Sequence, residues 1–113
     1  MKNLLLAVTI ALFGFSAHAQ NKDKNAKVAF HVDGNCEMCK KRIEKAAIAT
    51  PGVKSATWDI STEILSLIIN EEKTNVETVQ KAIAKVGHDN EGVKATAEDY
   101  SKLHTCCAYE RTE

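Results

Sequence analysis

The sequence predicts an α+β fold, a ferredoxin-like βαββαβ sandwich with a four-stranded antiparallel sheet, two helices on one face and a short helical tail at the C-terminus. Apolar residues alternate at every second position in several short segments, as in half-buried strands. Two longer segments repeat apolar residues every three or four positions, as in amphipathic helices. These segments interleave along the chain, and right-handed crossovers then join two βαβ units in one sheet.

The first strand and the first helix follow directly on one another. Residues 27–33 alternate apolar and polar side chains, which predicts a half-buried strand, and Gly34–Asn35 interrupts it. Residues 37–49 place apolar and small side chains along one side of a helix. This helix is expected to end before Pro51, because the residue preceding a proline is pushed out of the α region.

A hairpin and a second helix come next. Residues 54–60 and 63–69 alternate again and are separated by a two-residue turn, which predicts two antiparallel strands. Thr74–Asn75 can cap a helix whose apolar residues recur at helical spacing, and Gly87 is the expected stop. The last strand is expected within residues 89–95.

The start of the chain predicts a secretory signal peptide over residues 1–19. Lys2 supplies a positive charge, Leu4–Phe15 is an apolar run, and Ala17-His18-Ala19 is a small-x-small cleavage site. The apolar run is shorter than the roughly 20 residues that span a bilayer. We therefore expect a periplasmic or secreted protein with no stable membrane insertion after cleavage.

Cleavage leaves 94 of the 113 residues. Residues 20–26 form a polar leader, 27–95 the folded domain, and 96–113 a C-terminal tail. The mature charge is close to zero, because 14 of the 15 basic residues remain against 15 acidic ones. That balance argues against a nucleic-acid binder, and the patterned 44% of apolar residues argues against a disordered chain. The four cysteines would pair in an oxidising compartment unless a metal or a reductant keeps them apart.

Cys36 and Cys39 lie between the predicted first strand and first helix. Two thiols at this spacing can converge on one ion, at sulfur–metal distances of about 2.3 Å for zinc. A helix N-terminus lowers thiol pKa and stabilises thiolate. Thiolate is the ligand of soft metals, which include Cu(I), Zn(II), Cd(II) and Hg(II).

The same spacing has other interpretations. It also occurs in thiol–disulfide exchange proteins, in half of a structural zinc site, and in structural disulfides. A thioredoxin-like site would need a proline facing the pair from a later loop, but Pro51, the single proline, ends the helix that the pair begins. The chain shows no nucleophile–base pair, phosphate-binding loop or carboxylate dyad, so we expect a binding protein and no enzyme.

The element order and the position of the cysteine pair resemble the heavy-metal-associated domain family, which includes copper chaperones, the metal-binding domains of copper-transporting ATPases and the periplasmic mercury-binding protein. The resemblance covers residues 27–91 and is carried by Cys36-x-x-Cys39, Ile43-Glu44, Pro51-Gly52-Val53, Ala82-Ile83 and Gly87-His88.

The resemblance implies that Cys36 and Cys39 bind a soft ion, most often Cu(I), and exchange it with a metal-transporting membrane protein or another metallochaperone. It is compatible with a monomer or a metal-bridged dimer. The family usually carries Gly-Met-x-Cys-x-x-Cys. Here Gly34 stands two residues before Cys36, so the loop is one residue shorter and lacks that methionine. Met38, inside the pair, is not its equivalent.

The tail carries a second cysteine pair that the family resemblance does not cover. Thr96 can cap a short helix over 97–103, and Cys106-Cys107 follow it. The pair can return near Cys36 and Cys39, and a site of three or four thiolates would suit zinc, cadmium or a small Cu(I) cluster. The alternatives are a vicinal disulfide, disulfides to the first pair or an intermolecular bridge.

Other candidates surround the cysteine loop. His88 follows Gly87 at the same end of the predicted sheet, where it is either a third ligand or hydrogen-bond donor, or an exposed loop histidine. His31 is expected to face away from the core without a metal role. A basic cluster after Cys39 either steers an acidic partner or forms a solvated helix face; it comprises Lys40, Lys41, Arg42 and Lys45.

Overall fold

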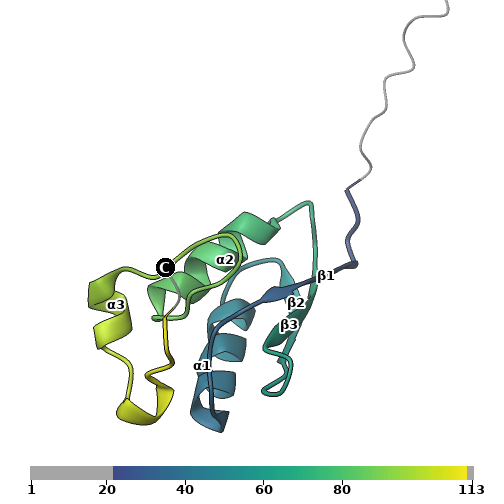
Figure 1. The fold of residues 1–113 in the computed structure, drawn as a ribbon. Helices are drawn as coiled ribbons and strands as arrows, with labels where there is room; N and C mark the ends of the chain where they lie inside the picture. Colours follow the sequence, from purple (N-terminus) through teal and green to yellow (C-terminus); the bar gives the residue numbers. More distant parts are fainter. Residues whose placement is uncertain (1–21, 112–113) are drawn as a thin grey trace, which may run out of the picture.

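The computed structural model describes residues 22–111 (Figure 1). The predicted signal peptide, residues 1–19, lies outside the described residues, as do the first two residues of the leader. Within 22–111 no helix has the length and apolar character needed to cross a membrane.

Three strands form one antiparallel sheet: β1 (Ala26–His31), β2 (Val53–Trp58) and β3 (Ile64–Ile69). Their order is β1-β3-β2, so β3 pairs with both neighbours. Helix α1 (Glu37–Ile48) lies between β1 and β2 in the sequence, and helix α2 (Val76–Lys85) follows β3. The predicted hairpin and both predicted helices are therefore confirmed, with small shifts at their ends.

Local chemistry explains where the helices begin and end. Cys36 is the extended residue immediately before α1, so its sulfur lies at the positive end of that helix. Asn75 caps α2, since its side chain accepts the Thr78 N–H at 2.9 Å. Gly87 ends the segment with a φ of +101°, a conformation that glycine adopts without strain.

The core lies between the helices and one face of the sheet. Trp58 is fully buried there, and its Nε1–H donates to the Val32 carbonyl at 3.1 Å. Other large buried side chains come from β1, β3 and both helices: Phe30, Leu65, Leu67, Ile69, Ile43, Val79 and Ile83. Cys39 and Cys107 belong to the same cluster, so the cysteine pairs are attached directly to the core.

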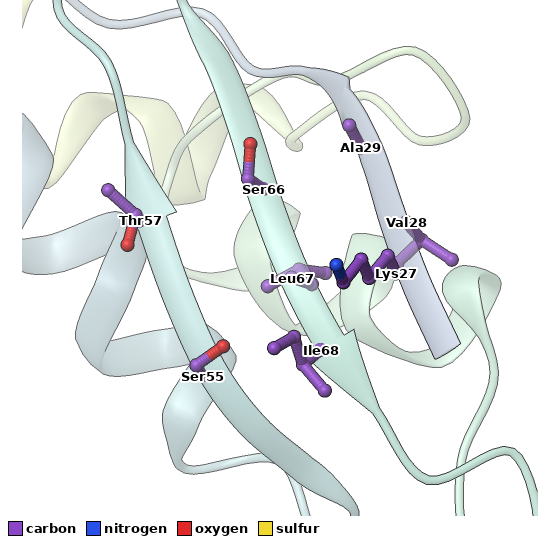
Figure 2. A pocket seen from close by; sticks show the side chains of 8 residues that line it. All are labelled: Lys27, Val28, Ala29, Ser55, Thr57, Ser66, Leu67 and Ile68. Atoms are coloured by element: carbon purple, nitrogen blue, oxygen red, sulfur yellow. The ribbon is translucent and has the colours of Figure 1, made fainter. Parts of the chain in front are cut away.

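The other face of the sheet is open and carries the shallow pocket of Figure 2. Short side chains line most of it, and Lys27 is its only charged lining residue: the pocket is bordered by Lys27, Val28, Ala29, Ser55, Thr57, Ser66, Leu67 and Ile68. None of the cysteines lines this pocket.

The predicted fourth strand over residues 89–95 is wrong for the described chain. That segment makes a single isolated bridge, between Val32 and Asn90. Directly after it the Asn90 side chain accepts the N–H groups of Gly92 and Val93, which folds the backbone into a turn. The sheet of residues 22–111 therefore has three strands.

The tail contains two short helical segments, α3 (Ala97–Ser101) and the 3₁₀ turn η1 (Thr105–Cys107). Thr96 caps α3 as predicted, with its hydroxyl accepting the Asp99 N–H at 3.0 Å. The helix ends at Ser101, two residues before the predicted end. In Figure 1 the tail runs beside the helices, and η1 packs against α1.

Candidate functional site

The first cysteine pair lies at the start of α1 as predicted. The sulfurs of Cys36 and Cys39 are 3.4 Å apart. Cys36 is partly exposed, whereas Cys39 is buried in the core and donates to the Asn35 side-chain oxygen at 3.3 Å. The pair therefore presents one sulfur near the surface and one sulfur inside the protein.

The tail brings the second pair to the first. Cys107 Sγ lies 3.4 Å from Cys36 Sγ, and the sulfurs of Cys36, Cys106 and Cys107 all lie within 4.8 Å of one another. All four cysteines are free thiols. The prediction that the tail can return near the first pair is thus confirmed for the positions of the thiols, while their metal-binding role stays a prediction.

A fifth sulfur lies at the edge of this group. The thioether of Met38 is 3.3 Å from Cys106 Sγ, and the Met38 side chain is exposed. Sequence reasoning did not include Met38 in the site, because Met38 does not occupy the methionine position of the family motif. No sequence pattern indicated the contact between Met38 and Cys106, because this contact depends on where the tail lies in the folded protein.

The surroundings give the thiols of the first pair different acidities. Burial acts to raise the pKa of Cys36, but hydrogen bonds from the Cys39 N–H and from the thiols of Cys107 and Cys39 lower it to about 7. Deeper burial raises the pKa of Cys39 to about 12, and its contacts with the Cys107 and Cys36 sulfurs act in the same direction. Cys36 is therefore the thiol that is available as thiolate near neutral pH.

His88 is fully buried, so the interpretation as an exposed loop histidine is wrong. Its Nδ1 lies 2.8 Å from the Asp33 carbonyl oxygen, which can only accept, so Nδ1 carries the proton and Nε2 keeps its lone pair. Nε2 has no hydrogen-bond partner among residues 22–111. Burial lowers the pKa of His88. His88 does not belong to the three-sulfur group, and its role as a ligand stays a prediction.

The predicted basic cluster is split in the structure. Lys40 pairs with Glu44 at 2.6 Å and donates to the Trp58 carbonyl at 2.9 Å, so it links α1 to β2. The other three basic residues, Lys41, Arg42 and Lys45, line a groove along α1 together with Met38, Ala46, Ala49 and Val86. That groove reaches Met38, which lies beside Cys106.

A second group of potential ligands involves His31, for which we expected no metal role. Its Nε2 lies 3.1 Å from Glu63 Oε2, and its Nδ1 lies 3.4 Å from Asp33 Oδ1. Glu63 also accepts the Gly34 N–H at 3.4 Å. These contacts pair the ionisable groups with one another and hold the start of the cysteine loop to the β2–β3 turn.

Comparisons with known proteins agree with the fold. Two copper-exporting P-type ATPases are similar to this chain: that of Staphylococcus saprophyticus is 37% identical over 67 residues, and that of Bacillus subtilis is 33% identical over 63. The matches cover 59% and 55% of this chain but 8% of each ATPase, so the chain spans only a small part of these relatives.

Solved structures show the same likeness over all or nearly all of their own length. The CopZ metallochaperone superposes with a TM-score of 0.57 at 27% identity, over 58% of this chain and all of that one. Oxidised MerP from Ralstonia metallidurans gives 0.57 at 25% identity, over 59% and 94%. The model of the heavy-metal-associated domain matches residues 29–89, which include Cys36 and Cys39 and exclude the tail. The chain therefore belongs to the heavy-metal-associated domain family.

Proposed function

We propose that the protein is an exported metallochaperone or sequestering protein that binds Cu(I) through Cys36 and Cys39. The observation that carries the proposal is the free thiol pair at the N-terminus of α1, with sulfurs 3.4 Å apart, in a chain of this family. Two nearby thiolates form a soft ligand set, which prefers Cu(I) to hard cations. The named copper proteins among its relatives support the choice of metal.

The different acidities of the two thiols suggest an order of binding. Cys36 offers a thiolate first, because its pKa is about 7. The buried Cys39 gives up its proton only when the ion arrives, so binding releases a proton and the affinity rises with pH. The core around Cys39 excludes water from one side of the ion, and the partly exposed Cys36 leaves a route for ligand exchange.

The partner that we propose is a metal-transporting membrane protein or another metallochaperone with an acidic docking surface. Lys41, Arg42 and Lys45 line the groove beside the thiols and would complement such a surface. The protein would act as a monomer or as a metal-bridged dimer, in the periplasm or outside the cell.

Native mass spectrometry of the mature protein, purified without oxygen and loaded with Cu(I), tests the metal. We expect bound Cu(I) in the wild type and loss of it in Cys36→Ser/Cys39→Ser. Competition with Zn(II), Cd(II) and Hg(II) identifies the preferred ion. No bound Cu(I) in the wild type would refute the metal assignment. Cell fractionation with N-terminal sequencing tests export, for which an N-terminus at Gln20 outside the cytoplasm is expected.

Thiol–disulfide exchange is the alternative that the split pKa values favour, because an accessible thiolate beside a buried thiol also suits disulfide chemistry. Catalytic turnover measured in excess Cu(I) chelator separates the two functions. Sustained turnover would favour exchange. A protein with two permanent disulfides and no affinity for Cu(I) under mild reduction would instead favour a purely structural role for the cysteines.

A further inference from the structure

We infer that the tail, residues 96–111, is a built-in part of the metal site, and that Cys106 and Cys107 join Cys36 and Cys39 as ligands of the same Cu(I). The inference rests on the proposed function and extends it. A Cys-x-x-Cys pair alone supplies two sulfurs, whereas this chain would hold the ion with three or four. Such a site is suited to retaining an ion that a two-sulfur site would release readily.

The sulfur positions fit this assignment. Four thiolates at about 2.3 Å around one ion have their sulfurs about 3.8 Å apart. Cys36 Sγ lies 3.4 Å from the sulfurs of both Cys39 and Cys107, and the Cys106 sulfur lies within 4.8 Å of Cys36 and Cys107. The sulfurs of Cys36, Cys106 and Cys107 therefore need only small shifts to surround a common ion, whereas Cys39, which contacts Cys36 but lies outside this three-sulfur group, would have to move further to complete a set of four. The Met38 thioether beside Cys106 adds a further soft donor at the exposed edge.

The chain before the second pair is held against the end of α2. Gly87 lies so close to the tail that a Cβ atom there would be 2.9 Å from the Asp99 carbonyl oxygen and 2.9 Å from Leu103 Cδ2. Leu103 packs against the core cluster. A side chain at position 87 would therefore push α3 and Leu103 away and move the thiols that follow.

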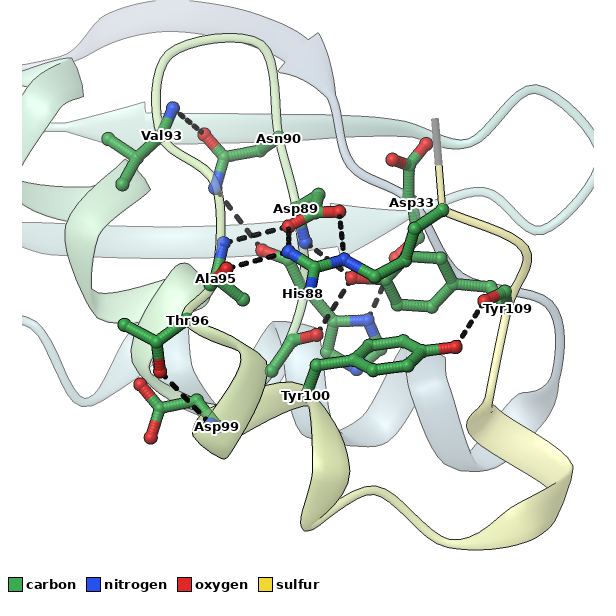
Figure 3. Close-up of polar contacts among 12 residues, drawn as sticks. Asp33, His88, Asp89, Asn90, Val93, Ala95, Thr96, Asp99, Tyr100 and Tyr109 are labelled. Carbon is green, nitrogen blue, oxygen red and sulfur yellow. Dashed lines mark hydrogen bonds and ion pairs between the residues drawn. The ribbon is translucent and has the colours of Figure 1, made fainter. Parts of the chain in front are cut away.

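The chain after the second pair is anchored more strongly, as Figure 3 shows. Tyr109 is buried, and its hydroxyl donates to the Gly87 carbonyl and accepts the Asp89 N–H, each at 2.8 Å. Its ring stacks on His88 with the centroids 5.6 Å apart. Arg111 makes a two-pronged ion pair with the buried Asp89 at 2.8 and 2.9 Å. The Tyr100 hydroxyl donates to the Tyr109 carbonyl, so the parts of the tail before and after the second cysteine pair are also bonded to each other.

These anchors act on both sides of Cys106 and Cys107, so the fold positions the pair without help from a metal. Cys107 is fully buried against α1, whereas Cys106 is exposed. A tail that served only to cover the core would need neither thiol. All four cysteines are free thiols, so each sulfur is available as a ligand.

The test uses the mature, reduced, full-length protein with one equivalent of Cu(I). X-ray absorption counts the sulfur ligands, and mass spectrometry after brief alkylation reports which thiols the ion protects. We expect three or four sulfurs in the wild type and two in Cys106→Ser/Cys107→Ser. We also expect Cu(I) to protect the exposed Cys106. The double variant should bind Cu(I) about tenfold more weakly or worse, a change of 1.4 kcal/mol per factor of ten.

Ala108→Ser is the matched control, because it adds a hydroxyl at an exposed position next to the pair and removes no thiol. Since replacement of the buried Cys107 can weaken the fold, Arg111→Ala provides a second test that keeps every sulfur. Loosening the tail should speed release of Cu(I) to a chelator. Two sulfur ligands in the wild type, with Cys106 alkylated equally fast with and without Cu(I), would overturn the role of the tail and leave the proposed function intact. Absence of Cu(I) binding in the wild type would overturn both.

Discussion

Cys36 and Cys39 belong to one short motif, yet their environments give them opposite acidities. Cys36 precedes α1, where backbone N–H groups and neighbouring thiols stabilise its thiolate. Cys39 is three residues further along and points into the core, where charge is costly. Helical geometry produces this difference, since one residue stands at the helix end and the other in its first turn.

This asymmetry predicts the alkylation of the metal-free protein. The Cys36 rate should rise with pH through a midpoint near 7, because the reactive thiolate forms above the pKa. Cys39 should stay nearly unreactive up to pH 9, since burial both hides it and holds its pKa near 12. Site-resolved mass spectrometry over pH 5 to 9 measures both rates. Equal midpoints for the two thiols would contradict the assignment, and Cys36→Ser serves as the control.

Gly34 illustrates how closely the cysteine loop approaches the core. A Cβ atom there would lie 3.0 Å from the Trp58 ring and 3.1 Å from Cys39 Cβ. The ring is fully buried and held by its bond to the Val32 carbonyl, so it has little room to yield. The loop itself must then move.

Gly34→Ala should accordingly destabilise the protein by about 1–3 kcal/mol, the usual cost of overpacking. Urea denaturation followed by Trp58 fluorescence measures the loss. Gly92→Ala is the matched control, because the atoms that its Cβ would meet belong to the flexible end of the Gln80 side chain. The prediction is wrong if Gly92→Ala costs as much as Gly34→Ala.

At the scale of elements, the sequence predicted those whose signal is periodic and local. Both helices and the β2–β3 hairpin formed where their apolar spacing placed them. In place of the strand expected over 89–95 the chain makes one bridge and then turns, because the Asn90 N–H donates to the Val93 carbonyl at 3.0 Å and several of the N–H groups that follow donate to side chains. Asn90 accepts two backbone N–H groups beyond it, and the Asp89 carboxylate accepts the Ala95 N–H at 2.7 Å. Apolar alternation carries no information about such competition.

The Asn90 side chain should therefore contribute strongly to the stability of the protein, because it holds the turn that stands in place of the predicted strand. It is buried, and its amide also donates to the Gln80 carbonyl at 3.0 Å. Asn90→Ala would leave these backbone groups without their partner, at a cost of about 1–3 kcal/mol. Chemical denaturation provides the value, with the exposed neighbour Glu91→Ala as control. A loss no larger than that of Glu91→Ala would show that the turn is held by other contacts.

At the scale of the whole molecule, half of the candidate site could be predicted from sequence. Cys36 and Cys39 follow from a short motif in a recognisable element order. The length of the tail allowed Cys106 and Cys107 to return, but their position depends on contacts between residues far apart in the chain, such as Tyr109 with His88 and Arg111 with Asp89. The Met38 contact is a consequence of that return. No local pattern marks these pairs.

The Arg111–Asp89 ion pair joins the tail to the domain, and it makes the stability of the molecule pH-dependent. Burial acts to raise the pKa of Asp89, but the Arg111 guanidinium and the Ala95 N–H hold it below its ordinary value. A carboxyl group with a lowered pKa contributes stability above its unfolded pKa of about 4, and this contribution is lost as the pH falls through the lower folded value.

Arg111→Ala should cost about 3 kcal/mol at pH 7, because it leaves the buried Asp89 charge without its partner. The difference from wild type should begin to shrink as the pH falls below about 4, where Asp89 of the unfolded chain becomes protonated, and it should disappear once the pH has passed through the lower folded pKa of wild type. Urea denaturation of the metal-free, reduced proteins at pH 7, 5 and 3 measures it, with the exposed neighbour Glu110→Ala as control. A difference that stays constant over this range would mean that Arg111 holds the tail through its contact with the Tyr100 ring and the Ala95 carbonyl, and that its charge pairing with Asp89 contributes little.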